Sequence, residues 1–294
     1  MKTQNILVLG NTGMLGQQVY KTLSKKESLN VRGTNRISGD DSSSEFKFYA
    51  EVDIQYQLDK ITKKFMPDFI INCVGVIKNH IDDKNPNHVE NAIMVNALYP
   101  HILADYFEKK NSSTKIIQIA TDCVYTGETG PYKESCLHDA KDVYGKTKSL
   151  GEVNRNNVYN IRTSIIGLEI KGKTSLLEWF LSNKDGDEVY GFENHLWNGV
   201  STIQFADLCL DIISGNFRKK FGDIQNFNYV INEDINKSEL LKLINKTFKR
   251  NIKIKPTSTF TEDVDRRLRS EIFTMKNKFK MSEVINEIYL KRND

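Results

Sequence analysis

Residues 5–16 read NILVLGNTGMLG, and this stretch decides the fold of the chain. Its first half is a short apolar run typical of a buried strand, and its second half is a glycine-rich turn that opens a helix. Glycine at positions 10, 13 and 16 permits positive φ, close approach of a pyrophosphate to backbone N–H groups, and tight packing of the helix on the strand. The helix N-terminus adds a partial positive charge. The spacing predicts a dinucleotide-binding turn, and a glycine-rich turn without a ligand is the alternative.

Strands and helices alternate along the chain after this start, as a doubly wound parallel sheet requires. The pattern predicts strands near 30–33, 46–50 and 68–75, helices over 57–65 and 89–110, and a polar loop at 38–44. Beyond residue 167 the alternation becomes irregular. We therefore expect an α/β fold, with a doubly wound Rossmann domain over residues 1–166 and a smaller, partly interleaved substrate-binding lobe over 167–294.

The segment VYGKTK at 143–148 places Tyr144 and Lys148 four residues apart, so the two share one face of a helix. An ammonium beside a buried phenol lowers the pKa of the tyrosine toward the working pH. The hydroxyl can then give or take a proton while hydride moves elsewhere. This is the chemistry of a carbonyl reductase or an alcohol dehydrogenase. Taken alone, the spacing also fits a surface tyrosine beside a solvated lysine.

Residues 116–125, IIQIATDCVY, predict a further apolar strand upstream of that tyrosine. The strand ends in a hydroxyl residue, Thr121, which can hydrogen-bond the oxygen of a carbonyl substrate. With the glycine-rich turn and the Tyr144–Lys148 pair, it favours the enzymatic interpretation over the surface one.

These three elements, in this order, resemble the extended short-chain dehydrogenase/reductase family over essentially the full length of the chain. The segments most similar to its dTDP-4-dehydrorhamnose reductase branch are TDCVYTG, GPYKE, YGKTK and GE at 121–127, 130–134, 144–148 and 151–152. The resemblance implies NADPH-dependent reduction of a 4-keto-6-deoxy nucleotide sugar, for deoxysugar or cell-surface polysaccharide biosynthesis. Tyr144 would donate the proton, Lys148 would tune it, and Thr121 would orient the carbonyl.

The resemblance also implies which residues contact the cofactor. Besides Tyr144 and Lys148, they are Gly10, Asn11, Thr12, Gly13, Met14, Leu15, Gly16, Asn35, Arg36, Asp53, Ile54, Cys73, Val74 and Gly75. Asp53 matches the family position that meets the adenine amino group. A helix cap is the alternative role for this aspartate.

Asn96 is a candidate for the proton relay, because Pro100 follows it by four residues and proline has no N–H to donate. The carbonyl of Asn96 is then left free, and it could hold a water behind Lys148. The resemblance implies a relay role for an asparagine on this helix. A kinked helix with a surface asparagine is the alternative.

The choice between cofactors is read after the second strand, where an acidic residue normally accepts hydrogen bonds from the 2′-hydroxyl of NAD. The sequence there is VRGTNR at 31–36, which has no carboxylate. Arg36, or Arg32 as the less favoured choice, could instead pair with a 2′-phosphate, so NADPH is preferred and NADH remains possible. A solvated arginine is the alternative.

Several residues are expected to line a substrate cleft under the resemblance. They are Val76, Lys78, Asp122, Cys123, Arg162, Trp197 and Arg266. A guanidinium such as Arg266 could pair with the substrate diphosphate. Each also has a structural alternative: Trp197 as core, Arg162 as a packed ion pair, and Arg266 as part of a charged turn.

Cys123 argues against a dehydratase. Dehydratases of this superfamily carry a glutamate at this position, directly after the residue that corresponds to Asp122. A cysteine two residues after the catalytic hydroxyl residue also occurs in GDP-fucose synthases, where it serves epimerisation. Their partner histidine is not evident here, where the comparable stretch reads KGKTSL at 171–176. The expectation is reduction without epimerisation, with Cys123 as a small buried apolar residue.

Composition excludes several other classes of protein. The 294 residues carry a net charge of only +4, without a basic cluster that would indicate nucleic acid. The four cysteines show no metal-ligand or disulfide spacing, so no metal is expected. A strand begins directly after residue 4 and no apolar run approaches the ~20 residues of a membrane span, so a cytoplasmic protein is expected.

Two classes of function remain open. The first is the reductase, with a bifunctional epimerase/reductase as its variant. The second is a non-catalytic, NADP-binding regulatory subunit, since the beta subunit of methionine adenosyltransferase is similar to the same reductases. The intact Thr121, Tyr144 and Lys148 set favours the enzyme. A homodimer is possible by analogy, through the helices that carry Asn96 and Tyr144.

Overall fold

The computed structural model describes residues 3–36, 45–110, 112–259, 261–274 and 278–293. The polar loop expected at 38–44 lies outside these ranges. The chain divides into two compact units, of which the first comprises residues 1–121, 141–161 and 203–226 and the second comprises 122–140, 162–202 and 227–294. The expected division at residues 166 and 167 into cofactor and substrate parts stays a prediction about function.

A seven-stranded sheet organises the first unit, in the order β11-β6-β5-β4-β1-β2-β3. The strands are β1 Gln4–Leu9, β2 Leu29–Asn35, β3 Glu45–Lys47, β4 Phe69–Asn72, β5 Lys115–Ile119, β6 Val158–Arg162 and β11 Asn226–Asn228. The pairs from β3 through β6 are parallel. This is the doubly wound α/β sheet that the sequence predicts, and the prediction is confirmed.

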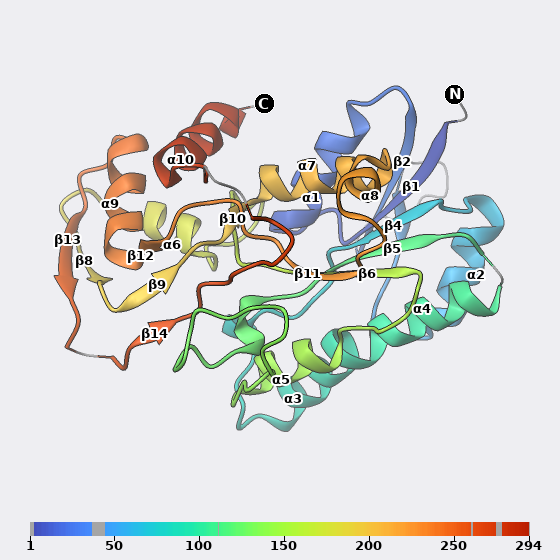
Figure 1. Ribbon diagram of the computed structural model, residues 1–294, viewed down its shortest axis with the longest axis horizontal. Coiled ribbons are helices and arrows are strands. Elements are labelled where there is room, and N and C mark those ends of the chain that lie inside the picture. The colour runs from blue at the N-terminus through green and yellow to red at the C-terminus, as the bar shows by residue number, and fades with distance from the viewer. Residues whose placement is uncertain (1–2, 37–44, 111, 260, 275–277, 294) are drawn as a thin grey trace. The chain divides into compact units, whose positions relative to one another are not determined.

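Helices cover both faces of this sheet (Figure 1). One layer is α1 Met14–Ser24, α7 Thr202–Ile213 and α8 Asn216–Phe221. The other is α2 Ile54–Lys64, α3 Pro86–Ala92, α4 Tyr99–Lys109 and α5 Val143–Leu150. Apolar side chains from the strands and from α2 and α4 form the core under the second layer, among them Leu7, Ile70, Leu58, Leu103 and Phe107. Burial of these side chains is the main favourable term in the stability of the unit.

The helix predicted over 89–110 is three segments rather than one. A π-helical segment, η2 (Ile93–Leu98), separates α3 from α4, and Pro100 lies in the first turn of α4. Because proline cannot donate to the carbonyl four residues before it, the regular ladder is interrupted at this point. The predicted helix is thus confirmed in its extent, since residues 86–109 are helical without a gap, but its interior is π-helical. The strand predicted over 116–125 is also shorter, because β5 ends at Ile119 and a 3-10 turn, η3, covers Asp122–Val124.

The second unit is built from short sheets and helices. Its strands are β7 Ile165–Ile166 with β10 Val200–Ser201, β8 Glu188–Phe192 with β13 Lys253–Thr257, and β9 His195–Trp197 between β12 Ile235–Asn236 and β14 Val264–Asp265. Its helices are α6 Leu176–Ser182, α9 Lys237–Thr247 and α10 Met281–Leu290, with a 3-10 turn, η4, at Lys291–Asn293; another, η1, lies at Lys78–His80 in the first unit. Every helix over the described ranges is too short or too polar to span a lipid bilayer.

Two glycines of the first turn have different tasks. Gly10 has φ +76, a left-handed conformation that side chains other than glycine rarely adopt. A Cβ at Gly16 would lie 2.1 Å from the backbone oxygen of Gly10, so α1 packs directly on the turn. A Cβ at Gly13 would meet nothing closer than 3.6 Å. Gly13 is thus not required for packing.

Gly16→Ala should lower the free energy of unfolding by roughly 1–3 kcal/mol, because backbone atoms of the turn cannot move aside without shifting α1. Gly13→Ala is the matched control and should cost less than about 1 kcal/mol, the scale of a lost glycine N-cap. Urea unfolding followed by circular dichroism measures both. Equal losses in the two variants would contradict the packing role of Gly16.

Candidate functional site

Lys148 is anchored at the end of β5. Its side chain is 7% exposed, and its Nζ donates a hydrogen bond of 2.8 Å to the carbonyl oxygen of Ile119. Burial lowers the pKa of Lys148 to about 8, while the charges of Glu152 and Cys73 act in the opposite direction. Thr121 follows Ile119 by two residues and is itself buried. The helix that carries Lys148 is thus fixed at the strand end that leads to Thr121.

Tyr144 lies half-buried on the same helix, one turn before Lys148. Asp142 caps that helix, because its Oδ1 accepts from the backbone N–H of Gly145 at 2.7 Å. The other carboxylate oxygen accepts from Nζ of Lys78 at 2.7 Å. Asp83 accepts from the backbone N–H of Val143 at 3.1 Å. These contacts hold the N-terminal turn of α5, and with it Tyr144, against the segment that follows β4.

Asn96 is fully enclosed, at 2% exposure. Its Oδ1 accepts from the N–H of Val76 and its Nδ2 donates to the carbonyl of Val76, both at 2.9 Å. A Cβ at Gly151 would lie 1.9 Å from the Asn96 backbone oxygen, so that carbonyl packs against the end of α5. The alternative of a surface asparagine is therefore wrong, because the side chain is buried and holds the backbone after β4. The water relay stays a prediction.

The turn between β1 and α1 fits an anionic dinucleotide. Helix α1 has no side-chain cap and no acidic residue in its first turn, so no carboxylate of the helix itself offsets the partial positive charge of its N-terminus. The space around Gly13 leaves the backbone open to close approach. The buried Oδ1 of Asn11 has no hydrogen-bond partner. All three observations match the pyrophosphate site that the glycine spacing predicts.

The two arginines considered for a 2′-phosphate differ in their surroundings. Arg32 lies with its guanidinium 5.4 Å from the ring centroid of Phe46 and 5.2 Å from that of Phe65. Arg36 is 62% exposed and pairs with Glu51 at 3.2 Å. Arg32 therefore packs against two aromatic rings, and Arg36 is the arginine with the exposed side chain.

The remaining cofactor candidates surround the same strand ends. Asp53 caps α2, since its Oδ1 accepts from the N–H of Tyr56 at 3.2 Å, and Ile54 is buried in the core. Cys73 follows β4 directly, and burial raises the pKa of its thiol to about 12. Val74 donates its N–H to Oδ1 of Asn72 at 3.2 Å. The cap proposed as an alternative for Asp53 is thus present, and an adenine contact stays a prediction.

Lys78 and Val76 are the substrate candidates that lie in the first unit. Lys78 is engaged with Asp142, and Val76 is held on both sides of its backbone by Asn96. Both residues position the helix and loop around Tyr144. The structure gives them this local task and does not test a substrate contact.

Four of the substrate candidates of the second unit gather around Lys237, which the sequence reasoning missed. The ammonium of Lys237 lies 4.6 Å from the ring centroid of Trp197. Burial lowers the pKa of Lys237 to about 8; the charges of Asp122 and Cys123 raise it, and that of Arg266 lowers it. Lys237 is the first residue of α9, and nothing in its local sequence distinguishes it from a solvated helix start.

Two arginines among the substrate candidates donate hydrogen bonds to backbone carbonyls. Arg162 is 8% exposed, and its Nη1 donates to the carbonyl of Glu134 at 3.4 Å. Arg266 donates from Nε to the carbonyl of Tyr125 at 3.1 Å. Arg162 is thus a packed residue, as its structural alternative expects, and it bonds the carbonyl of Glu134.

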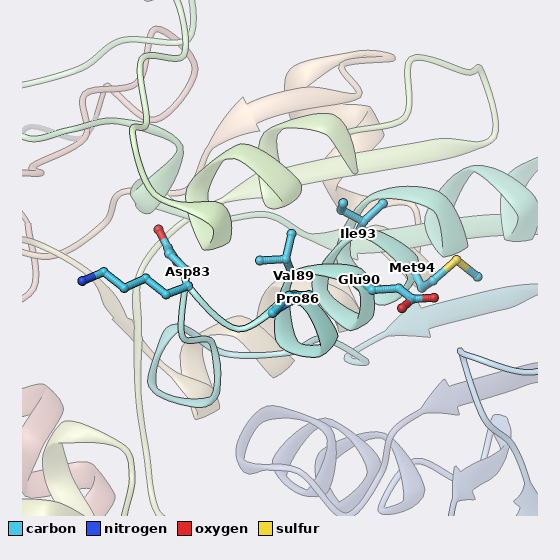
Figure 2. Close-up of a pocket in the computed structure, with 7 residues that line it drawn as sticks. Asp83, Pro86, Val89, Glu90, Ile93 and Met94 are labelled. Carbon is cyan, nitrogen blue, oxygen red and sulfur yellow. The ribbon is translucent and has the colours of Figure 1, made fainter.

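A separate hollow of about 420 Å³ lies on α3 and η2. Figure 2 shows its lining residues, which include Asp83, Pro86, Val89, Glu90 and Ile93. None of the lining residues is a catalytic or cofactor candidate. Asp83 connects it to α5 through the hydrogen bond to Val143.

Comparison with known proteins identifies a family over most of the chain. The RmlD substrate binding domain family matches residues 4–287. A dTDP-4-dehydrorhamnose reductase from Clostridium acetobutylicum has a TM-score of 0.74, 20% identity, and coverage of 99% of this chain and 100% of its own. The Bacillus anthracis dTDP-4-dehydrorhamnose reductase in complex with NADP has a TM-score of 0.75, 16% identity and 99% coverage of both chains. At sequence identities of 20% and 16%, these similarities show a shared fold only.

Relatives found by sequence cover less of the chain. Methionine adenosyltransferase 2 subunit beta from Xenopus tropicalis is 29% identical over 146 residues, which are 50% of this chain and 41% of the relative. Spore coat polysaccharide biosynthesis protein SpsK from Bacillus subtilis is 29% identical over 89 residues, 30% of each chain. The matches thus span less than half of the length of each of these relatives.

The buried ammonium of Lys148 predicts a pH dependence of stability. Its pKa of about 8 in the folded state is below the ordinary 10.5, so the unfolded chain binds more protons between these values and stability rises with pH there. The unfolding free energy of the wild type minus that of Lys148→Met should increase by about 3 kcal/mol from pH 7 to pH 10.5. Urea titrations at several pH values measure this difference.

Lys146→Met, at an exposed position of the same helix, is the matched control and should show no comparable increase. If the difference in unfolding free energy between the wild type and Lys148→Met does not change with pH, the buried, charged state of Lys148 is contradicted.

Proposed function

We propose, because the chain belongs to the RmlD substrate binding domain family, that it reduces the 4-keto group of a nucleotide-linked 6-deoxysugar. The observation that carries this proposal is the buried Lys148 ammonium, one helical turn after Tyr144 and bonded to the strand end beside Thr121. The reaction would serve deoxysugar or cell-surface polysaccharide biosynthesis. The similarity of one segment to a spore coat polysaccharide biosynthesis protein supports that setting.

Each residue of the set has a separate task in this proposal. Tyr144 donates its phenolic proton to the substrate oxygen as that oxygen gains charge. Lys148 favours the phenolate that remains, because its ammonium lies on the same helical face and is shielded from water. The Thr121 hydroxyl donates a hydrogen bond to the same oxygen and orients it. A nicotinamide dinucleotide supplies hydride when bound.

NADPH is the proposed reductant, with NADH accepted as well. Arg36 lies at the end of β2 with its guanidinium 62% exposed, and a guanidinium pairs well with a phosphate. The NADP in the Bacillus anthracis structure supports this choice. The residues that would hold the dinucleotide are those of the turn between β1 and α1 and those at the ends of β2 and β4.

Bifunctional epimerisation and reduction is the second candidate, and the electrostatic interaction between Lys237 and Cys123 supports it. An epimerase needs two groups that can exchange protons with carbons beside the ketone. Cys123 and Lys237 act on each other electrostatically, and the pKa of Lys237 is about 8. Lys237 is therefore the candidate for the second group that exchanges protons, besides Cys123.

A regulatory subunit without catalysis is the third candidate, favoured by the similarity to methionine adenosyltransferase 2 subunit beta.

For each of these candidates we propose that the protein is located in the cytoplasm and forms a homodimer. Exposed Ile93, Leu98 and Leu150 on η2 and α5 support a dimer through these segments. Sedimentation velocity would disprove the dimer if the protein stayed monomeric at micromolar concentration.

Tyr144→Phe should retain dinucleotide binding but reduce turnover of a 4-keto-6-deoxy nucleotide sugar by two to four orders of magnitude, roughly the effect of losing a general acid. NADPH oxidation in a panel of such sugars measures turnover, and calorimetry measures binding. Wild-type turnover in the variant would refute the role of Tyr144. If the wild type binds the dinucleotide but consumes no NADPH with any sugar, the regulatory candidate takes precedence.

Reduction in heavy water distinguishes the two catalytic candidates. Simple reduction should give product without deuterium at C3 or C5, and this remains the expected result. Enzyme-dependent deuterium at either carbon, abolished by Cys123→Ser and by Lys237→Met while reduction persists, would establish the bifunctional reaction instead. Mass spectrometry and NMR of the product locate the label.

A further inference from the structure

A carboxylate reaches the end of β2 from the neighbouring strand. Glu45 begins β3 and stands opposite Gly33 in the parallel register of β2 and β3. Its Oε1 accepts a hydrogen bond of 2.6 Å from Nδ2 of Asn11, in the glycine-rich turn. Its Oε2 accepts a short hydrogen bond from Nδ2 of Asn35, the last residue of β2. One carboxylate thus joins three segments that meet beside the dinucleotide turn.

The surroundings of this carboxylate are closely packed. Asn11 and Asn35 are 6% and 7% exposed, so both amides are held in place. Gly33 makes room for the arrangement, because a Cβ there would lie 2.3 Å from Nδ2 of Asn11. Backbone contacts fix the same corner: the N–H of Asn11 donates to the carbonyl of Thr34 at 3.0 Å.

An acidic residue at the end of the second strand has a known role in dinucleotide-binding sheets. An acidic residue beside the end of the second strand accepts hydrogen bonds from the adenosine ribose, and its charge disfavours a 2′-phosphate. Residues 31–36 contain no such acid. Glu45 brings one to the same place from β3. The amides of Asn11 and Asn35 are neutral hydrogen-bond donors, and they orient the carboxylate.

We propose that Glu45 sets the cofactor selectivity of this chain, by accepting a hydrogen bond from the ribose 2′-hydroxyl of NADH and by repelling the 2′-phosphate of NADPH. The inference rests on the dinucleotide binding of the proposed function. Glu45 and Arg36 then act in opposite directions, since the Arg36 guanidinium attracts the phosphate. Their balance lets one site take either cofactor.

Binding of each cofactor to the protein without a sugar substrate tests the proposal. Dissociation constants for NADH and NADPH are measured by calorimetry for the wild type, Glu45→Gln and Arg36→Ala. In Glu45→Gln the ratio of the NADH to the NADPH dissociation constant should rise by about tenfold or more, the scale of one hydrogen bond to a charged acceptor. In Arg36→Ala the same ratio should fall.

A matched control separates this effect from a general change in charge. Glu27→Gln removes the same charge at an exposed position that precedes β2, and its ratio should equal that of the wild type. A second measurement uses only wild-type protein, in case Glu45→Gln does not fold. 2′-Deoxy-NAD should bind about tenfold more weakly than NAD, because it lacks the hydroxyl that Glu45 accepts from.

An unchanged ratio in a folded Glu45→Gln variant would overturn the proposal, and so would equal binding of NAD and 2′-deoxy-NAD. Glu45 would then only tie Asn11 to Asn35. Failure of every sugar to be reduced would refute the proposed reaction and leave these binding ratios intact. If neither NADH nor NADPH binds, the proposed function and the role of Glu45 are both overturned.

Discussion

The hydrogen bond from Lys148 to the carbonyl of Ile119 is the interaction on which the arrangement of Thr121, Tyr144 and Lys148 depends. A buried ammonium without a partner costs several kcal/mol, so the lysine can be enclosed only where an acceptor meets it. The C-terminal end of β5 provides that acceptor. Since Lys148 is fixed to the strand, the face of α5 that carries Tyr144 is fixed as well. This bond therefore helps to position both residues of the pair to which we assign proton transfer.

Both ends of α5 are held by tertiary contacts, which a helix of eight residues needs because it is marginal on its own. Asp142 caps its start and binds Lys78. At its end, Gly151 packs on the carbonyl of Asn96, and His101 bonds the carbonyl of Leu150 at 2.8 Å. The π-helical segment at Asn96 widens the neighbouring helix where α5 contacts it. Irregular backbone here thus serves a close helix contact.

The sequence predicts the parts of this molecule whose chemistry is carried by local spacing. The strand before Gly10, the helix that starts at Met14, and the shared face of Tyr144 and Lys148 follow from periodicity and turn geometry. The sequence indicates the irregularity near Asn96 only in part. Pro100 marks a missing donor, but whether the helix kinks or widens depends on what packs against it. The sequence left open whether the side chain of Asn96 is at the surface, and the packing around η2 encloses it.

Residues whose role arises from strand pairing or from a distant helix start could not be found in this way. Glu45 reaches Asn11 and Asn35 only because β3 pairs with β2 in a register that sets Glu45 opposite Gly33. A slip of one residue would turn its side chain to the other face of the sheet. Lys237 meets Trp197 only through the fold of the second unit. An acid that reaches the end of β2 from the neighbouring strand therefore leaves no sign in the residues that follow β2 along the chain.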